Sequence, residues 1–286
     1  MYTTFYKNEK IQQPNFTAEV CFDYYNERIR IDDYRGNVSL LSKWLDEIAA
    51  QNNFHKIIIK SRHDDLSKWL ELGFIYEGEF TGYFNGASAV SMCKYLNNER
   101  RNSSYWIEED KIIKDVLKLS PTSISNSMPK EYTLRMADEQ DAKELADLYS
   151  QVFEVYPTPM DDPEYVLKMI KSGTLFCVVT YQKRIVSAAS ADVNAVYHNA
   201  EITDCATLTE HRKFGLMKHL IDHLEQELFK RKIYCSYSIA RALSYGMNAV
   251  FHQKGYVYKG RLANNCKIFD KYEDMNIWVK DLSESI

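Results

Sequence analysis

The chain has 286 residues, of which 45% are apolar and 27% are charged, and its formal net charge is −4. This composition is typical of a globular protein in water, and a general nucleic-acid binder would be more basic. The six cysteines form no C-x-x-C pair, which favours reduced thiols, and no uninterrupted apolar run is long enough to span a membrane. We therefore expect a cytoplasmic protein of one large or two domains, with neither a nucleic-acid nor a membrane partner.

The first part of the chain contains a pattern that returns later. The segment "ERIRIDDYRGNVSLLSKWLDEIAAQNNFHKIIIKSR" predicts a strand, an amphipathic helix and a second strand. The later segments "WLELGFIYEGEF" and "FHQKGYVYKGRL" resemble each other, because Gly73 and Gly78 have the same separation as Gly255 and Gly260. We interpret residues 19–96 as a degenerate copy of the second half without its earlier strands. The charged segment "NNERRNSSYWIEEDKIIKDVLKL" predicts a connecting helix.

A change of composition marks the boundary between the two halves. The segment "LKLSPTSISNSMPKEY" replaces periodic apolar residues with serines, two prolines and an asparagine, which is typical of a linker. We therefore predict an N-terminal domain over residues 1–118, a linker over 119–130 and a second domain over 131–286.

The second half predicts the element order β-α-α-β-β-β-α-β-α-β-β. Asp138 is expected to cap the first helix, and Gly173 to end the second. Three strands then follow from "LFCVVTYQKRIVSAASADVNAVYHNAEITDCATL". Further helices are expected over residues 216–229 and 244–253.

The segment "HRKFG" stands where the third of these strands meets a helix. A helix N-terminus presents unpaired backbone N–H groups and a partial positive charge, which suit a phosphate group. Arg212 and Lys213 add positive charge, and Gly215 allows the backbone to approach a ligand closely. Neither G-x-x-x-x-G-K-[ST] nor G-x-G-x-x-G follows any strand, so a P-loop and a dinucleotide-binding fold are not expected. The pattern favours a pyrophosphate-bearing ligand.

The residues Arg212-Lys213-Phe214-Gly215-Leu216-Met217 resemble the R/Q-x-x-G-x-G/A motif of the GNAT superfamily of acyl-CoA-dependent N-acyltransferases. Met217 departs from the Gly or Ala that the superfamily prefers. The segments "YTLRMADEQDAKELADLY" and "MNAVFHQKGYVYKG" are similar to its first strand and helix and to its last helix and strand. The resemblance covers residues 131–282. It implies an α/β (α+β) fold with a mixed central sheet flanked by helices, preceded by a degenerate GNAT-like half, and acetyl-CoA as co-substrate.

The resemblance also implies which residues contact acetyl-CoA. The pantetheine arm would pair with the main chain at the end of a splayed strand, and the phosphates would bind the loop. The implied cofactor-binding residues are Ala206, Thr207, Leu208, Arg212, Lys213, Phe214, Gly215, Leu216, Met217 and Asn248. For Asn248, an amide on the helix surface is an equal alternative. We expect no metal: His219 and His223 have a metal-compatible spacing but fall at the solvated border of an amphipathic helix.

Two carboxylates on the strand before the loop are candidate catalytic residues. The segment "EITDCA" is similar to the E-I-x-x-C-A strand of histone acetyltransferases, which implies Glu201 as the general base. A base is useful because a primary amine is mostly protonated at pH 7. Strand alternation places Glu201 and Asp204 on opposite faces, and a bulge or reversed faces would turn Asp204 toward the cleft instead. Either carboxylate could also serve only as a cap or an ion-pair partner.

The general acid is less clear from the sequence. GNAT enzymes often place a tyrosine on the last helix to protonate the departing thiolate, and the matching position here holds Phe251. Phenylalanine cannot donate a proton. Water, Tyr245 or Tyr256 would serve instead, or the thiolate would leave unaided, which its low pKa allows.

The acceptor is predicted from resemblance. Acidic residues near the expected cleft suit a cationic small-molecule amine, and the predicted substrate-binding residues are Tyr156, Asp161 and Asp192. The degenerate first half together with "VFEVYPTPMDDPEYV", "EITDCATL" and "ARALSYGMNAVFHQKGYVYKGRLANNCKI" resembles the β-lysine N6-acetyltransferase family. That family makes the compatible solute Nε-acetyl-β-lysine. The alternatives are another amine, such as a polyamine, lysine or a protein lysine, and a non-catalytic acyl-CoA sensor. The oligomeric state is not readable.

Overall fold

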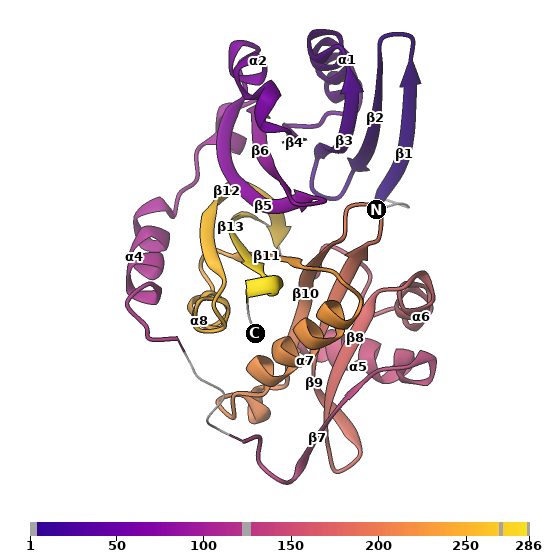
Figure 1. Cartoon of the computed structure of the whole chain (residues 1–286), viewed down its shortest axis with the longest axis vertical. Coiled ribbons are helices and arrows are strands. Elements are labelled where there is room, and N and C mark those ends of the chain that lie inside the picture. Colours follow the sequence, from indigo (N-terminus) through magenta and orange to yellow (C-terminus); the bar gives the residue numbers. More distant parts are fainter. Residues whose placement is uncertain (1–4, 122–126, 269–270, 285–286) are drawn as a thin grey trace.

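The computed structural model describes residues 5–121, 127–268 and 271–284. Within these residues the first half forms a run of strands with helices on its outer side (Figure 1). Its elements are β1 (Tyr6–Gln13), β2 (Phe16–Asp23), β3 (Arg28–Gly36), α1 (Val38–Gln51), β4 (Lys56–Ser61), α2 (Leu66–Glu71), β5 (Ile75–Phe84), β6 (Ala87–Tyr95), α3 (Asn98–Arg101) and α4 (Trp106–Val116).

The second half has the element order that the sequence predicts. Its elements are β7 (Tyr132–Met136), α5 (Ala142–Val152), α6 (Pro163–Ser172), β8 (Leu175–Tyr181), β9 (Arg184–Asn194), β10 (Asn199–Thr207), α7 (Leu216–Lys230), β11 (Cys235–Arg241), α8 (Tyr245–Gln253), β12 (Val257–Ile268) and β13 (Lys271–Asp281). Asp138 accepts a hydrogen bond from the N–H of Gln140 in the short 3-10 turn that leads into α5. Gly173 ends α6 in the left-handed conformation that glycine favours.

All strands of the described residues belong to one 13-stranded sheet, in the order β1-β2-β3-β4-β6-β5-β12-β13-β11-β10-β9-β8-β7. The two halves repeat one topology. In the first half β3 and β4 are parallel and joined through α1, and in the second half β10 and β11 are parallel and joined through α7. The remaining neighbours are antiparallel, so β2-β3-β4-β6-β5 corresponds to β9-β10-β11-β13-β12.

Two expectations for the first half are wrong. It does not lack the earlier strands, because β1 and β2 precede β3 in the places that β8 and β9 occupy in the second half. The counterparts of β7, α5 and α6 are the parts that have no equivalent among its described residues. The connecting segment is also not one helix, since it is interrupted after Arg101 and begins again at Trp106. The described parts of residues 119–130 form no helix or strand, and 122–126 lie outside the described residues.

The halves join through β5 and β12, where Gly78 faces Gly260. A Cβ on Gly260 would lie 2.2 Å from the carbonyl oxygen of Glu77, so the two backbones touch only because both positions lack side chains. An aromatic cluster crosses the same joint, in which Phe80 and Tyr83 pack against Tyr197 and Tyr237. The two halves therefore share a core as well as a sheet.

The helices of the second half cover both faces of the sheet. Leu220, Ile221 and Leu224 of α7 pack on one face, and Leu145 and Tyr149 of α5 on the other. In these helices apolar residues recur every three or four positions, so they gather on one side, and that side packs on the sheet. No helix within the described residues is long and apolar enough to cross a membrane.

Candidate active site

A wedge opens between β10 and β11. These parallel strands pair only over three residues, from Asn199–Cys235 to Glu201–Tyr237. Beyond Glu201, β10 stays with β9 as far as Thr207, while β11 stays with β13. The facing main chains of β10 and β11 are therefore not paired with each other beyond this point, and an extended chain can enter between them.

The loop of residues 212–215 follows the end of β10 and leads into α7. Lys213 and Gly215 both have left-handed backbone, with φ of 72° and 73°. No side chain caps α7, no acidic residue lies in its first turn, and a Cβ on Gly215 would meet no atom within 4 Å. The Nε of Arg212 donates to the carbonyl oxygen of Thr207, 3.2 Å away, which ties the loop to the strand end. The unpaired N–H groups and open space fit a phosphate group.

The predicted cofactor-binding residues from Ala206 to Met217 thus lie at the end of β10, in the loop that follows it and in the first turn of α7. Leu208 donates its N–H to the carbonyl oxygen of Val186, which fixes the strand end against β9. Ala206 is buried, and the exposed Phe214 ring lies 5.8 Å from that of Tyr132. The arrangement brings main chain, positive charge and a helix N-terminus to one edge.

Asn248 occupies a different environment. Its side chain is fully buried, and its Nδ2 donates to the carbonyl oxygens of Arg241 and Ser244. Its Oδ1 accepts from Asn276 and Trp278. The alternative of an amide on the helix surface is therefore wrong. The side chain holds α8 to β11 and β13, and a contact with the cofactor stays a prediction.

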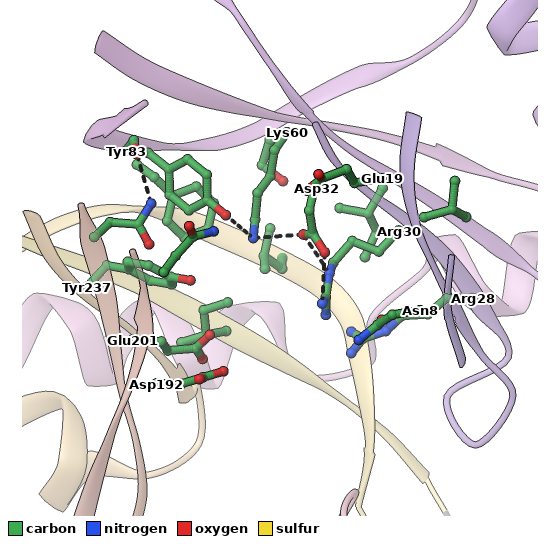
Figure 2. A pocket seen from close by; sticks show the side chains of 18 of the residues that line it. Asn8, Glu19, Arg28, Arg30, Asp32, Lys60, Tyr83, Asp192, Glu201 and Tyr237 are labelled. Carbon is green, nitrogen blue, oxygen red and sulfur yellow. Dashed lines mark hydrogen bonds and ion pairs between the residues drawn. The ribbon is translucent and has the colours of Figure 1, made fainter. Parts of the chain in front are cut away.

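Glu201 lies at the point where the wedge begins, on the wall of a cavity of about 560 Å³ between the two halves (Figure 2). Burial raises the pKa of Glu201 to about 7, since the charges of Lys60 and Arg30 only partly offset the desolvation and Asp192 adds repulsion. Asp192 is opposite Glu201 in the β9–β10 register and lines the same cavity. A carboxylate whose pKa is near 7 is suited to accept a proton at neutral pH.

Asp204 shares a face with Glu201, so plain strand alternation is wrong here, and the predicted alternative of an intervening bulge is the arrangement found. A bulge between Thr203 and Ala206, with φ of 48° at Asp204, breaks the alternation of the strand. The carboxylate of Asp204 accepts hydrogen bonds from the hydroxyls of Ser190 at 2.6 Å and Tyr156 at 3.0 Å. Ser190 and Asp192 lie on one face of β9, and Glu201 pairs with Asp192. Burial raises the pKa of Asp204, and these two hydroxyls oppose the rise.

The predicted acceptor residues do not come together. Asp192 lines the cavity, whereas Tyr156 belongs to the α5–α6 connection and stacks on Phe153 of the same connection, with 4.5 Å between ring centroids. Asp161 is exposed on that connection and is not among the residues that line the cavity. Of the three, the structure places only Asp192 beside Glu201.

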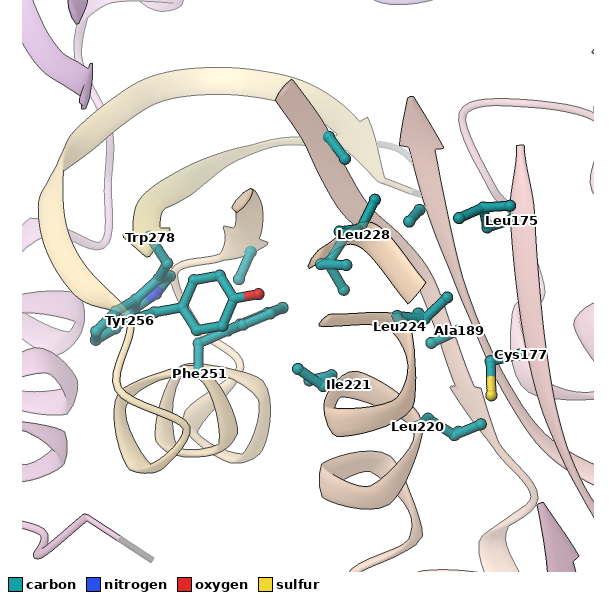
Figure 3. Packing of buried hydrophobic residues seen from close by; sticks show 14 of the residues in the cluster. Leu175, Cys177, Ala189, Leu220, Ile221, Leu224, Leu228, Phe251, Tyr256 and Trp278 are labelled. Carbon is teal, nitrogen blue, oxygen red and sulfur yellow. The ribbon is translucent and has the colours of Figure 1, made fainter. Parts of the chain in front are cut away.

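The last helix offers no proton donor at the expected position. Phe251 is buried between α7 and α8, with its ring 5.1 Å from that of Tyr256 (Figure 3). The hydroxyl of Tyr256 is buried and bonded to that of Ser236 at 2.7 Å. Tyr245 is exposed at the start of α8. The hydroxyl of Tyr256 is therefore already hydrogen-bonded in the core.

The sequence suggests that the first half helps to shape the acceptor pocket, but it did not identify which of its residues line the cavity. Arg30, Asp32 and Lys60 lie on the wall opposite Glu201, and Tyr83 and Tyr237 line it nearby (Figure 2). Burial raises the pKa of the Tyr237 hydroxyl well above its ordinary value. The missed signal was local: charged residues at every second position of "RIRIDD" mark a strand face that is polar yet enclosed.

Metal binding has no structural support within the described ranges. No group of three or more His, Cys, Asp or Glu side chains gathers there. Asp222, which stands between the two histidines of α7, forms an ion pair with Lys254.

The chain is similar in sequence to known acetyltransferases. Residues 142–255 match the model of the acetyltransferase (GNAT) family. The chain is 38% identical to N-acetyltransferase YodP of Bacillus subtilis, over 96% of this chain and 99% of that protein. It is 35% identical to the β-lysine N(6)-acetyltransferase of Methanosarcina mazei, over 87% of this chain and 100% of that protein. The structure of yncA from Salmonella typhimurium, solved with its cofactor acetyl-CoA, is 14% identical over 54% of this chain and 95% of that one, with a TM-score of 0.47.

Proposed function

This chain belongs to the GNAT family of acetyltransferases and is an N-acetyltransferase that uses acetyl-CoA, and from that premise we propose that its acceptor is the N6 amine of β-lysine. The product would be Nε-acetyl-β-lysine, a compatible solute. The name of the Methanosarcina relative, which matches almost the whole chain, supports this acceptor.

One observation carries the mechanism. Glu201 stands where the β10–β11 wedge meets the cavity, so a thioester in the wedge and an amine in the cavity would meet beside its carboxylate. The pKa of about 7 lets Glu201 take a proton from the ammonium group of the acceptor near neutral pH. We therefore propose Glu201 as the general base, with Asp192 contributing negative charge to the amine site.

Asp204 has a different proposed role. Its carboxylate is already engaged by Ser190 and Tyr156, and it is not among the residues that line the cavity. We propose that it holds the α5–α6 connection against β10 and does not act as the base.

The reaction itself is an acyl transfer. The deprotonated amine attacks the thioester carbon, a C–N bond forms, and collapse of the tetrahedral oxyanion breaks the C–S bond and releases the thiolate of coenzyme A. The nitrogen of the new amide gives up its second proton to solvent, and the released thiolate takes up a proton from solvent. A thiol has a low enough pKa to leave as the anion, so a neighbouring acid is not essential. This agrees with the buried Phe251 on the last helix.

The cofactor is proposed to lie along the wedge. The N–H groups at the start of α7, with Arg212 and Lys213, would bind the phosphates, and the free edge of β10 would pair with the pantetheine arm. The left-handed backbone at Gly215 keeps this approach open.

The test is acetyl transfer by the purified protein. CoA release from acetyl-CoA is measured with β-lysine, α-lysine and spermidine, and the acetylated nitrogen is located by mass spectrometry. We expect the highest kcat/KM with β-lysine and acetylation of its terminal amine. Preference for spermidine, or acetylation of the other nitrogen, would contradict the proposal.

A further inference from the structure

We propose that the first half binds the carboxylate of the acceptor through Arg30, so that the cavity selects an amino acid with a side-chain amine over a polyamine. This inference rests on the proposed function, because it concerns the acceptor of the same reaction. It gives the degenerate half a role in recognition.

The two walls of the cavity differ in charge (Figure 2). On the side of the second half, the charged residues are Asp192 and Glu201, both acidic. The first half contributes cations and carboxylates together, with the cations in slight excess: Lys10, Arg28, Arg30 and Lys60 against Glu9, Glu19 and Asp32. Arg30 and Lys60 of β3 and β4 are both bonded to Asp32. A ligand with an amine at one end and a carboxylate at the other matches this separation of charge, whereas a polyamine would place a cation against the basic wall.

Arg30 has donors left for a ligand. Its Nε and Nη2 donate to the two carboxylate oxygens of Asp32, at 2.9 and 3.1 Å. Its Nη1 has no recorded partner among the described residues, and a third of the side chain is exposed to the cavity. The bidentate pair with Asp32 fixes the plane of the guanidinium, and a planar fork held in this way is well suited to a carboxylate.

The neighbouring cations are already committed. The Lys60 ammonium donates to Asp32 at 2.9 Å and to the Tyr83 hydroxyl at 2.8 Å, and it is almost fully buried. Arg28 donates to Asp23 and to the carbonyl oxygen of Asn265, so it ties the two halves together. Lys10 also lines the cavity, but it is paired with Glu19 and its side chain is largely exposed. Arg30 is therefore the cation on this wall that combines a fixed, partly buried position with an uncommitted donor group.

The same charges also act on the base. The positive charges of Arg30 and Lys60 lower the pKa of Glu201 against the effect of burial, so the two walls are near enough to interact. A carboxylate bound at Arg30 would neutralise part of this charge while the amine lies at the acidic wall. The geometry thus orients the acceptor with its side-chain amine toward the thioester.

The experiment compares paired acceptors and paired variants. The acceptors are β-lysine, its primary amide and the diamine that lacks only the carboxylate. The variants are Arg30→Gln and, as a matched control, Arg35→Gln at the exposed end of the same strand and outside the cavity lining. Loss of one charge-assisted interaction predicts an effect of about 10- to 100-fold.

In the unchanged protein, kcat/KM for the amide and for the diamine should fall about 10- to 100-fold below that for β-lysine. The variants are compared at about pH 9, where Glu201 is deprotonated with or without the charge of Arg30. Arg30→Gln should there lower kcat/KM for β-lysine by a similar factor, mainly through KM, and change the amide little. The KM for acetyl-CoA should not change, and Arg35→Gln should behave as the unchanged protein does. Arg30→Lys, which keeps the charge, should recover part of the loss with β-lysine.

Equal use of acid and amide by the unchanged protein would overturn the inference, as would an equal loss on both in Arg30→Gln. Failure of the proposed function gives a different result, because the unchanged protein would then not acetylate β-lysine. If another amino acid is the acceptor, the same comparison of that acid with its amide tests Arg30.

Discussion

Glu201 and Asp204, two carboxylates of β10, have different environments. Glu201 faces the cavity and receives no recorded hydrogen bond from the described residues, whereas Asp204 accepts two. Desolvation dominates at Glu201 and raises its pKa to about 7. An unpaired carboxylate in a shielded site is a costly arrangement for stability, and it is the arrangement that a general base needs.

The first prediction concerns Glu201. Because a base works only when deprotonated, kcat/KM should rise with pH through about pH 7 and then level off. Glu201→Gln should lower kcat about 100-fold or more and remove this limb of the profile. Steady-state kinetics measure the pH profile and the loss of kcat. A range from about pH 5.5 to about pH 9 extends roughly 1.5 to 2 units on each side of the pKa of Glu201.

A matched variant tests the cause of the shift. The negative charge of Asp192 raises the pKa of Glu201, so Asp192→Asn should move the limb to lower pH.

Acetyl-CoA binding, measured by calorimetry, should survive in Glu201→Gln. Normal turnover of Glu201→Gln at every pH would show that another group is the base.

At the scale of elements, the start of α7 depends on backbone geometry more than on side chains. Two left-handed residues, Lys213 and Gly215, lead the chain into the helix, and the space beside Gly215 is open. Glycine accepts this conformation without cost, whereas other residues pay about 1–2 kcal/mol. The glycine therefore sets the shape of the proposed phosphate site.

The second prediction is that Gly215→Ala weakens cofactor binding. Alanine is strained in the left-handed conformation, so the loop should adopt a different shape. This change should raise the KM for acetyl-CoA about tenfold and leave the KM for the acceptor nearly unchanged. Gly173→Ala is the control, because Gly173 is also left-handed with no atom within 4 Å of a Cβ, but it ends α6. An equal rise in the KM for acetyl-CoA in both variants would mean that general destabilisation is the cause.

At the scale of the molecule, the joint between β5 and β12 makes one sheet from two similar halves. In the first half, β3 and β4 pair from Arg28–Lys56 to Ile31–Ile59, and a hydrogen bond between side chains links them beyond that point. There the Tyr34 hydroxyl, beside the diverging ends of β3 and β4, bonds to Ser61 and Asp65 and accepts from Trp69. We propose that residues 131–286 hold the cofactor and the amine of the acceptor, that residues 1–118 bind its carboxylate, and that residues 119–130 are the linker between them.

The third prediction concerns this joint. Gly260→Ala would place a Cβ against the backbone of Glu77 and Gly78, at a φ of 143° that suits glycine alone. We expect the free energy of unfolding to fall by more than about 2 kcal/mol, measured by urea denaturation. The acceptor KM should rise with it, because the two walls of the cavity meet across this joint.

The matched control lies nearby in the sequence. Gly246 is helical in α8, and a Cβ there would meet no atom within 4 Å. Gly246→Ala should therefore change stability by less than about 1 kcal/mol, in the favourable direction. A Gly260→Ala variant as stable as Gly246→Ala would show that the halves are not joined in this way.

The sequence by itself determined the element order of the second half, because apolar periodicity, helix caps and turn residues act locally. It also located the loop at Arg212–Met217 and the strand that carries Glu201. The repeat of glycine spacing indicated that the halves are related. Each of these features depends on neighbours in the chain, so a pattern of residues is enough to identify it.

The tertiary structure decided the rest. The bulge at Asp204 depends on pairing with β9, and strand alternation alone placed that residue on the wrong face. The pairing of Gly78 with Gly260 and the approach of Arg30 to Glu201 join residues that lie far apart in the chain. Burial, and with it the pKa of Glu201, arises only when both halves enclose the cavity. No local pattern encodes such contacts, because they form between chain segments that the fold alone brings together.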